Sequence, residues 1–328
     1  MTNAPSISVI IATFTRATLL DECLTHLARQ PFVEADELIV VDNGSRDETG
    51  AVVERHQASF PVPLRLIYEP RPGKSHALAA ALAVARGDVL AFTDDDVNVA
   101  DGWLDALRSG LADPAVALVG GPVTPRWQDG VPGWIRQAAT RRARLGAPLA
   151  LLDYGPAPSP LGPRTFLGAN MAVRREVFTA LGGFATHLGK LRGTLLSGED
   201  HELCQRIQQA GYRALYLPDV RVRHWVPAHR ARVSYFLRWF YWSGITNAVM
   251  DGQAGPAPAR AVFGLPFHLI RRGLTGAAAV VGRIATGAPV EALDRAIDVA
   301  FVAGYAATRW GVTARGLTAA ARSTGGAS

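Results

Sequence analysis

The sequence predicts an α/β fold in which a doubly wound sheet is covered by helices on both faces. Between residues 6 and 121, five apolar strand-like runs alternate with four segments of helical periodicity. The runs are rich in Ile and Val at consecutive positions, which is typical of strands buried on both sides. Strands that alternate with helices in this way indicate a parallel sheet with helices on each face.

The expected elements follow one another in a regular order. The first strand, "SISVIIATF", leads into the helical segment "RATLLDECLTHLARQ", and each later run repeats this change of period from about 2 to 3.6. The expected strands cover residues 6–14, 37–44, 64–69, 89–95 and 116–121. The expected helices cover residues 16–30, 46–57, 73–87 and 100–113.

The alternation of strand-like and helical segments becomes irregular after residue 121 and then returns. Residues 122–165 are irregular and rich in Pro and Gly, and regular structure is expected over 164–184. Residues 198–225 are expected to form a capped helix, a turn at Gly211 and short strands. We therefore divide the chain into a main domain and a C-terminal helical extension. The predicted boundaries are 1–121 and 122–230 for the two halves of the main domain, and 231–328 for the extension.

The extension is aromatic, basic and rich in Ala. The segment "RVSYFLRWFYWSGITNAVM" is followed by a Pro/Ala linker at 252–260 and by two helical stretches interrupted by arginines. Two interpretations remain open: a helical cap packed on the main domain, or helices that lie on an anionic membrane surface. No apolar run reaches the length of about 18 residues that a transmembrane helix requires.

Charge and cysteine usage narrow the class of protein. The net charge is +6, and residues 221–328 carry 13 basic against 4 acidic side chains. A basic end can meet anionic lipid, nucleic acid or an acidic partner, but no recognisable nucleic-acid module accompanies it, so nucleic-acid binding is not expected. The two cysteines, Cys23 and Cys204, lie in separate amphipathic segments and are expected to be buried thiols. We expect a cytoplasmic protein, either free or peripheral on the inner face of the cell membrane.

Polar residues follow the ends of the predicted strands. They are Thr13, Asp42 with Asn43, Glu69 followed by Arg71, and the triplet Asp94, Asp95 and Asp96. Ligands of doubly wound sheets bind at the carboxyl ends of the strands, so these residues are expected to open on one edge.

The triplet places three like charges together, and a cation, a basic side chain or solvent could relieve their repulsion. In an extended segment Asp94 and Asp96 would point to one face and Asp95 to the other. Upstream, Gly73 precedes a helix whose first turn contains Lys74, an arrangement that suits phosphate oxygens. Paired carboxylates beside a phosphate site suit a divalent cation such as Mg²⁺ or Mn²⁺.

The ordered set "VIIATFTR", "IVVDNGSRDET", "EPRPGKSHALAAAL", "LAFTDDD", "FLGANMAVRREVFTALGGF" and "GEDHEL" resembles the family 2 glycosyltransferases of the GT-A fold. The resemblance covers residues 6–226. It implies a mixed, mostly parallel sheet, with a nucleotide-binding half before residue 122 and an acceptor-binding half after it. It also implies transfer of a sugar from a nucleotide-activated donor with inversion at the anomeric carbon.

The resemblance also assigns candidate site residues. Asp94 would contact the ribose and Asp96 the metal, with Asp95 able to take either role. His224, which ends a predicted strand, would complete the metal shell, although a lone His is often a core residue; His229 is a weaker candidate. The other nucleotide-sugar candidates are Thr13, Arg16, Asp42, Asn43, Arg71 and Lys74.

Inverting transfer needs a base for the acceptor hydroxyl. A carboxylate at a helix start that points into a cleft can serve, and the resemblance favours Asp200 with Glu199 near the acceptor. The alternative is an acidic pair that only stabilises the helix dipole. Trp127 and Trp134 could stack on a sugar or pack internally, and Asn170 is a further acceptor candidate.

The sequence therefore predicts a metal-dependent inverting glycosyltransferase acting in polysaccharide, glycolipid or other cell-surface glycan synthesis. UDP is the nucleotide most frequent in the family, with GDP and dTDP open. The acceptor is expected to be a glycan or a lipid-linked sugar. Two alternatives are a sugar-phosphate nucleotidyltransferase, which would want a Gly-rich basic loop after the first strand, and a non-catalytic nucleotide-sugar-binding module at a membrane.

Overall fold

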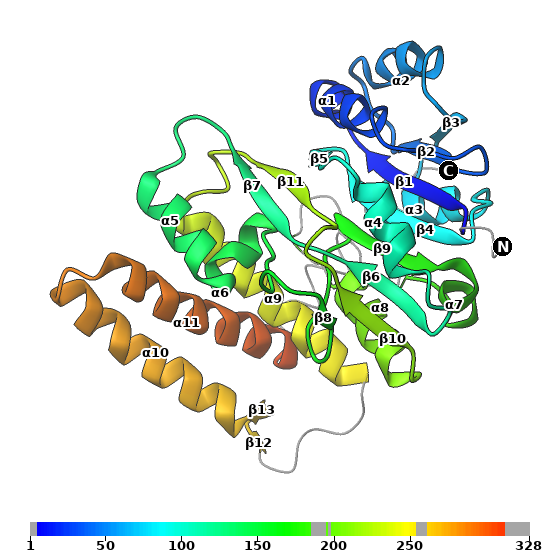
Figure 1. The fold of residues 1–328 in the computed structure, drawn as a ribbon. Coiled ribbons are helices and arrows are strands. Elements are labelled where there is room, and N and C mark those ends of the chain that lie inside the picture. The colour runs from blue at the N-terminus through cyan, green and yellow to red at the C-terminus, as the bar shows by residue number, and fades with distance from the viewer. Residues whose placement is uncertain (1–4, 185–194, 196–197, 254–260, 312–328) are drawn as a thin grey trace, which may run out of the picture. The chain divides into compact units, whose positions relative to one another are not determined.

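The structure is a computed structural model that describes residues 5–184, 195, 198–253 and 261–311 (Figure 1). The chain divides into two compact units. The first comprises residues 1–128, 150–192 and 198–226, and the second residues 129–149, 193–197 and 227–328. Residues 129–149, which the sequence analysis grouped with the acceptor half, are thus assigned with the C-terminal helices. Much of the predicted linker at 252–260 lies outside the described residues.

The first unit contains a mixed, mostly parallel sheet with the strand order β3-β2-β1-β4-β9-β6-β10-β8. Strands β1 to β4 run parallel, whereas β9 is inserted antiparallel between β4 and β6. This architecture confirms the predicted fold class. The strands are β1 (Ile7–Thr13), β2 (Glu37–Asp42), β3 (Leu64–Tyr68), β4 (Val89–Asp94), β6 (Val116–Gly120), β8 (Ser159–Pro160), β9 (Asn170–Arg174) and β10 (Arg213–Tyr216).

Helices cover both faces of this sheet because successive strand residues point to opposite sides. Ile7, Val9 and Ile11 of β1 pack in a core with α1, α2 and α4, whereas Ile10 packs in a second core with α3, α7 and α8. Cys23 and Cys204 are buried in these two cores, as predicted. The helices are α1 (Ala17–Leu27), α2 (Thr49–Gln57), α3 (Lys74–Leu82), α4 (Trp103–Gly110), α7 (Arg175–Ala180) and α8 (Glu199–Gln209).

A second, three-stranded sheet follows the aspartate triplet. Its order is β5-β11-β7, formed by β5 (Val97–Val99), β11 (Val222–Val226) and β7 (Val123–Trp127). The sequence analysis anticipated the strand at β11 but not its partners, because β5 has only three residues and β7 lies in the irregular region. Pairing of β5 with β11 brings His224 opposite Val97, one residue after the triplet.

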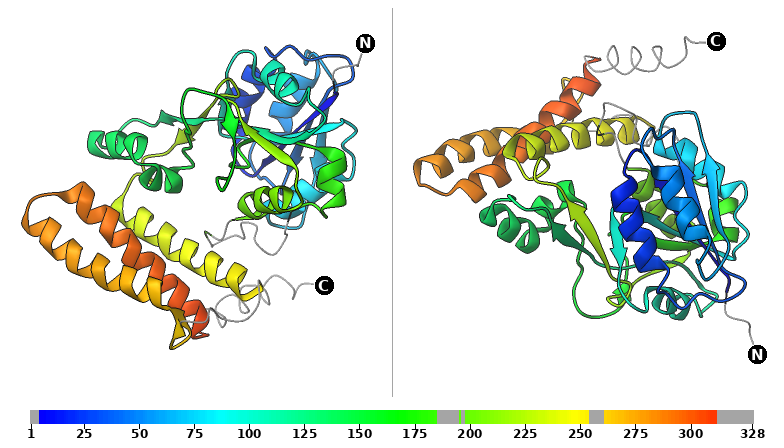
Figure 2. Two further views of the ribbon diagram at one scale, coloured as in Figure 1. Left: turned by 60° about the horizontal axis from the view of Figure 1, so that its bottom comes forward. Right: turned by 90° about the horizontal axis from the view of Figure 1, so that it is seen from above.

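The second unit is helical. Helix α11 (Pro289–Arg309) packs against both α9 (Val233–Gln253) and α10 (Phe267–Ala285), as the two views in Figure 2 also show. The unit also contains α5 (Gly133–Arg141), α6 (Ala143–Gly146), the 3₁₀ turn η1 (Ala147–Leu149) and the hairpin β12 (Ala261–Val262) with β13 (Leu265–Pro266). Among the helices that the structure describes, we find none that is apolar over a length sufficient to span a bilayer.

Candidate active site

The carboxyl ends of the central strands meet at one edge of the large sheet. The parallel register pairs Thr13 with Asp42, Ala12 with Asp94, and Asp42 with Tyr68. The predicted convergence of polar strand ends is therefore confirmed, since parallel strands in register must end at the same edge.

The aspartate triplet is compensated by two basic side chains. The Arg16 guanidinium donates hydrogen bonds to Asp95 at 2.9 Å and to Asp96 at 2.7 Å, and Thr13 Oγ1 donates to Asp95 at 2.8 Å. Asp94 is instead bonded to the Lys74 ammonium. The expectation that Asp94 and Asp96 share a face is wrong, because β4 ends at Asp94 and the next two residues form a turn in which strand alternation no longer applies.

Burial makes this cluster electrostatically demanding. Asp95 and Asp96 are each only 4% exposed. Burial raises the pKa of Asp95 above its ordinary value, and the Asp96 charge adds to this, while the Arg16 guanidinium opposes it. Arg16 is thus required near the triplet for electrostatic reasons, whatever else it contacts.

Asp96 and His224 are the two side chains of a candidate cation site. Asp96 Oδ2 accepts the bond from Arg16, whereas the buried Asp96 Oδ1 accepts no hydrogen bond from any described residue. That oxygen lies 3.4 Å from Nε2 of His224, which is 2% exposed. A carboxylate oxygen beside an imidazole nitrogen fits Mn²⁺ or Mg²⁺. Within the described ranges no group of three or more such ligands gathers, so this pair would leave other positions to substrate oxygens or water.

The loop between β3 and α3 is held by Asn43. Its Nδ2 donates to the backbone oxygens of Glu69 at 2.9 Å and Arg71 at 2.7 Å, and its Oδ1 accepts from Gly73 N at 2.8 Å. Asn43 therefore positions this loop in the structure. The Arg71 side chain pairs with Glu69 and is 65% exposed, so it stands at the rim of the edge.

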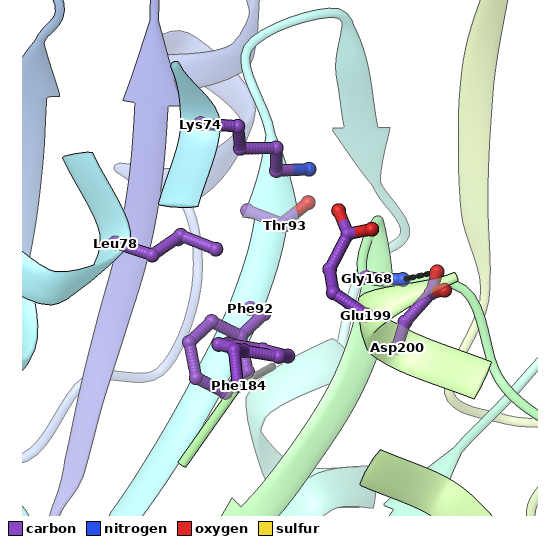
Figure 3. Close-up of a pocket in the computed structure, with 8 residues that line it drawn as sticks. All are labelled: Lys74, Leu78, Phe92, Thr93, Gly168, Phe184, Glu199 and Asp200. Atoms are coloured by element: carbon purple, nitrogen blue, oxygen red, sulfur yellow. Dashed lines mark hydrogen bonds between the residues drawn. The ribbon is translucent and has the colours of Figure 1, made fainter. Parts of the chain in front are cut away.

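A pocket lies beside Lys74, the residue that comes directly after this loop, as Figure 3 shows. Lys74 begins α3 after Gly73, whose φ of 127° is a conformation that favours glycine. Burial lowers the pKa of Lys74, but the carboxylates of Asp94, Glu199 and Asp200 outweigh it and keep the pKa above its ordinary value. Lys74 is thus a fixed cation. The pocket is lined by Lys74, Leu78, Phe92, Thr93, Gly168, Phe184, Glu199 and Asp200.

The carboxylates of Glu199 and Asp200 lie in the first turn of α8, after Gly198. Asp200 Oδ2 accepts a hydrogen bond from Gly168 N at 2.9 Å, which fixes the side chain in the pocket (Figure 3). A Cβ built on Gly168 would lie 3.9 Å from both Asp200 Oδ2 and Lys74 Nζ, so the acid and the cation both lie close to the Gly168 backbone. The helix dipole favours both acids, yet their side chains also face the pocket.

Of the three acceptor candidates, the structure excludes Asn170 and assigns the two tryptophans to different units. Asn170 is fully buried, and its amide is bonded to Trp103 Nε1 at 2.9 Å and to the backbone oxygens of Pro122 and Val220 at 3.1 and 2.7 Å. It has no surface left for an acceptor, so it is a core residue that connects β9 to its neighbours. Half-buried Trp127 ends β7 in the first unit, whereas exposed Trp134 belongs to α5 in the second.

Three features of this edge were not anticipated. Phe14 and Tyr68 are 43% and 66% exposed at the ends of β1 and β3, where an aromatic ring offers a flat surface for a base. Their position directly at a strand end is the signal that could have identified them. The role of the Gly168 backbone in holding Asp200 has no sequence signal, because it depends on a contact between residues 32 positions apart.

Comparison with known proteins identifies the family of the chain. A model of the family described as "Glycosyl transferase family 2" matches residues 8–181. The chain is 25% identical over 254 residues to the glucosyl-dolichyl phosphate glucuronosyltransferase of Haloferax volcanii, covering 75% of this chain and 77% of that protein. It is 28% identical over 244 residues to the succinoglycan biosynthesis protein ExoM of Rhizobium meliloti, covering 74% of each.

Similarity to solved structures extends over most of the chain. The mannosyltransferase PcManGT from Pyrobaculum calidifontis, solved in complex with GDP-Man and Mn²⁺, matches with a TM-score of 0.62 and 26% identity. The match covers 94% of this chain and 88% of that one.

Proposed function

The chain belongs to glycosyl transferase family 2, and from this premise we propose that it transfers a sugar from a nucleoside-diphosphate sugar to a hydroxyl acceptor with inversion. The observation that carries the proposal is the pocket in which the Lys74 ammonium, bonded to Asp94, faces the carboxylates of Glu199 and Asp200. A cation suited to a diphosphate and a base suited to a hydroxyl thus line one space.

The donor is proposed to bind along the edge of the large sheet. Asp42 would hydrogen-bond the base, Arg71 and Lys74 would lie near the base and the phosphates, and Asp94 or Asp95 would contact the ribose. Thr13, Arg16 and Asn43 support this site through the bonds that they make to the triplet and to the loop before α3. UDP is the predicted nucleotide, and GDP is its main competitor because the similar mannosyltransferase was solved with GDP-Man.

Asp96 and His224 are the residues that would hold a divalent cation, Mn²⁺ or Mg²⁺. The unbonded Asp96 Oδ1 beside His224 Nε2 supports this assignment, as does the Mn²⁺ in the similar mannosyltransferase structure. When bound, such a cation neutralises charge on the diphosphate.

Asp200 is proposed to accept the proton of the acceptor hydroxyl. As the acceptor oxygen bonds to the anomeric carbon, the bond from that carbon to the diphosphate oxygen breaks, and its electron pair leaves with the nucleotide. Lys74 stabilises the negative charge that develops there. The bond from Gly168 N orients Asp200, and Glu199 borders the space for the acceptor.

The acceptor is proposed to be a glycan or a lipid-linked sugar in cell-surface glycan synthesis. Two similar proteins support this class through their names, which refer to a dolichyl phosphate and to succinoglycan. Trp127 and Trp134 remain candidates for stacking on the acceptor. The enzyme is proposed to work in the cytoplasm at the inner face of the membrane, reached through the basic C-terminal unit.

A donor screen tests the proposal. Purified protein is incubated with Mn²⁺ and a panel of UDP-, GDP- and dTDP-sugars, and thermal stabilisation and slow donor hydrolysis are measured. We expect one nucleotide series to stabilise the protein only when metal is present, with release of the free nucleoside diphosphate. Release of pyrophosphate from a sugar phosphate and a nucleoside triphosphate would favour the nucleotidyltransferase alternative. Stabilisation without turnover on any acceptor would favour a binding module.

Replacement of the base tests its role separately. Asp200→Asn is expected to lower transfer by roughly 10²- to 10⁴-fold while donor binding is retained, because the amide cannot accept the proton. Glu202→Gln is the matched control: this first-turn acid of α8 pairs with Arg206 and does not line the pocket. Full transfer by Asp200→Asn would move the base to Glu199.

A further inference from the structure

Helix α10 exposes a line of large apolar side chains. Phe267, Leu274 and Val281 are spaced by seven residues and therefore lie on one face, and Ile284 follows one turn after Val281. All four are at least 60% exposed. Together with Phe263 and Trp310, described below, they form what we call the apolar ridge. Exposed large apolar side chains gathered on one helix face mark an interaction surface.

The ridge is exposed because α10 uses its other face to pack. Gly276 is buried against α11, where an added Cβ would lie 3.2 Å from the Arg295 backbone oxygen, and Leu269 is buried in the same cluster. The helix axis runs beside α11 for most of its length (Figure 2). The apolar residues of the ridge thus lie on a face that no described element covers.

The hairpin before α10 extends the ridge at a conformational cost. Phe263 and Gly264 form its two-residue turn, with φ of 51° and 76°, the left-handed region that disfavours a bulky residue. Phe263 is nevertheless 86% exposed. Trp310 fixes this turn, because its Nε1 donates to Phe263 O at 2.9 Å, and its own ring is 59% exposed. A strained, exposed Phe supports a role for this side chain outside the fold.

The charge around the ridge is positive. Helix α10 contains no carboxylate, and Arg271 and Arg283 are exposed on it without an ion pair to a described residue. Acids of α11 are already engaged with other arginines: Asp298 accepts from Arg144 at 2.5 Å and from Arg272 at 2.7 Å, and Glu291 accepts from Arg142 at 2.6 Å. Exposed Phe, Leu, Val and Trp flanked by arginines match the chemistry of an anionic bilayer surface.

We propose that the apolar ridge of α10 and its hairpin is the surface by which this protein binds an anionic membrane. The inference rests on the proposed membrane-side function and names the surface that would serve it. Phe236 and Phe240 of the aromatic segment are buried in α9, so the ridge and not these two rings would meet the lipid. A second copy of the chain suits the ridge less well, because α10 carries arginines and no carboxylate, so that pairing two α10 helices would bring like charges together.

Vesicle flotation of the full chain tests the proposal without any nucleotide sugar. Phosphatidylcholine vesicles with and without about one third phosphatidylglycerol are compared. The double variant Leu274→Gln/Val281→Gln is expected to lose binding by about tenfold or more. Arg271→Gln and Arg283→Gln are each expected to cost about fivefold, on the anionic vesicles only. The control Val33→Gln/Tyr212→Gln removes two exposed apolar side chains from the first unit and should bind like wild type.

Phe263→Asn separates function from folding. Asn tolerates the left-handed conformation, so the melting temperature should stay equal or rise while vesicle binding falls. Flotation of the Leu274→Gln/Val281→Gln variant equal to wild type would overturn the proposal. The proposal would also be overturned if sedimentation velocity showed that the wild type is a dimer and this variant a monomer, while flotation was unchanged. Donor hydrolysis in solution should be the same for the variant and wild type, so a failure of the donor screen would leave the ridge result intact.

Discussion

Replacing Gly304 by Ala should destabilise the C-terminal unit, although Ala favours a helix over Gly by about 1 kcal/mol. Gly304 of α11 and Gly244 of α9 lie where the two helices cross. A Cβ on Gly304 would lie 2.7 Å from the Tyr241 carbonyl carbon and closer still to its oxygen, and a Cβ on Gly244 would lie 2.8 Å from Tyr305 N. Both neighbours are backbone, so neither can turn away as a side chain would.

The magnitude follows from the separation that the helices would need. Relaxed carbon–oxygen contacts are roughly 3.3 to 3.6 Å, so the two backbones would have to move apart by about 1 Å or more. Overpacking of this kind costs typically 1–3 kcal/mol, and the upper end applies because the obstacle is backbone. After the gain in helix propensity, we expect a net loss of about 2 kcal/mol.

Urea unfolding followed by far-UV circular dichroism measures this loss as a lower midpoint for the helical transition. Gly282→Ala is the matched control, because this residue of α10 has no heavy atom within 4 Å of an added Cβ, and it should gain about 0.5–1 kcal/mol. If Gly304→Ala is as stable as wild type while Gly282→Ala shows its gain, the close crossing of α9 and α11 is refuted.

Three further predictions concern the first unit. Hydrogen bonds from Arg71 lower the pKa of Glu69 to about 2 from an ordinary 4.5. The contribution of the Glu69 carboxylate to stability is therefore complete above pH 4.5 and is lost as the pH falls toward 2. When stability is measured as a function of pH, the Glu69→Gln variant should lack this loss between pH 4.5 and 2. Asn170→Ala should cost roughly 3 kcal/mol, seen in urea unfolding, because it leaves Trp103 Nε1 and two backbone oxygens unsatisfied; transfer per folded molecule should change little. His224→Ala should weaken the Mn²⁺-dependent part of nucleotide binding by roughly tenfold or more, since the loss of a residue that only supports a metal ligand already costs about that much. Calorimetry with and without chelator measures this effect. An unchanged Mn²⁺ dependence would show that His224 is not part of the metal site.

Much of the fold and the location of the site follow from local sequence patterns. Runs of apolar residues such as those at 7–11 and 38–41 place apolar side chains on both faces of the strand. Both faces must therefore be buried, which requires a sheet with helices on both sides. Once these strands are parallel, the polar residues after them must meet at one edge. The position of the candidate site was therefore predictable before any contact was known.

Tertiary structure decided how the side chains at that edge are used. The period of a strand stops where the strand stops, so only the turn after Asp94 determined that Asp95 and Asp96 share Arg16. Asn170 looked like a polar site residue, but the antiparallel insertion of β9 buries it among backbone oxygens. The bond from Gly168 to Asp200 likewise depends on a pairing that no local pattern encodes.

The C-terminal helices show the same division. Their sequence determined that they would be amphipathic and basic, because helical period and composition are local properties. The sequence did not determine which apolar face would be covered by a neighbouring helix. Packing of α9 and α10 on α11 buries Leu269 and leaves Leu274 in solvent, since the close approach at Gly244, Gly276 and Gly304 fixes which faces meet. Local periodicity specifies an apolar face, and only the neighbours in space decide whether that face is covered.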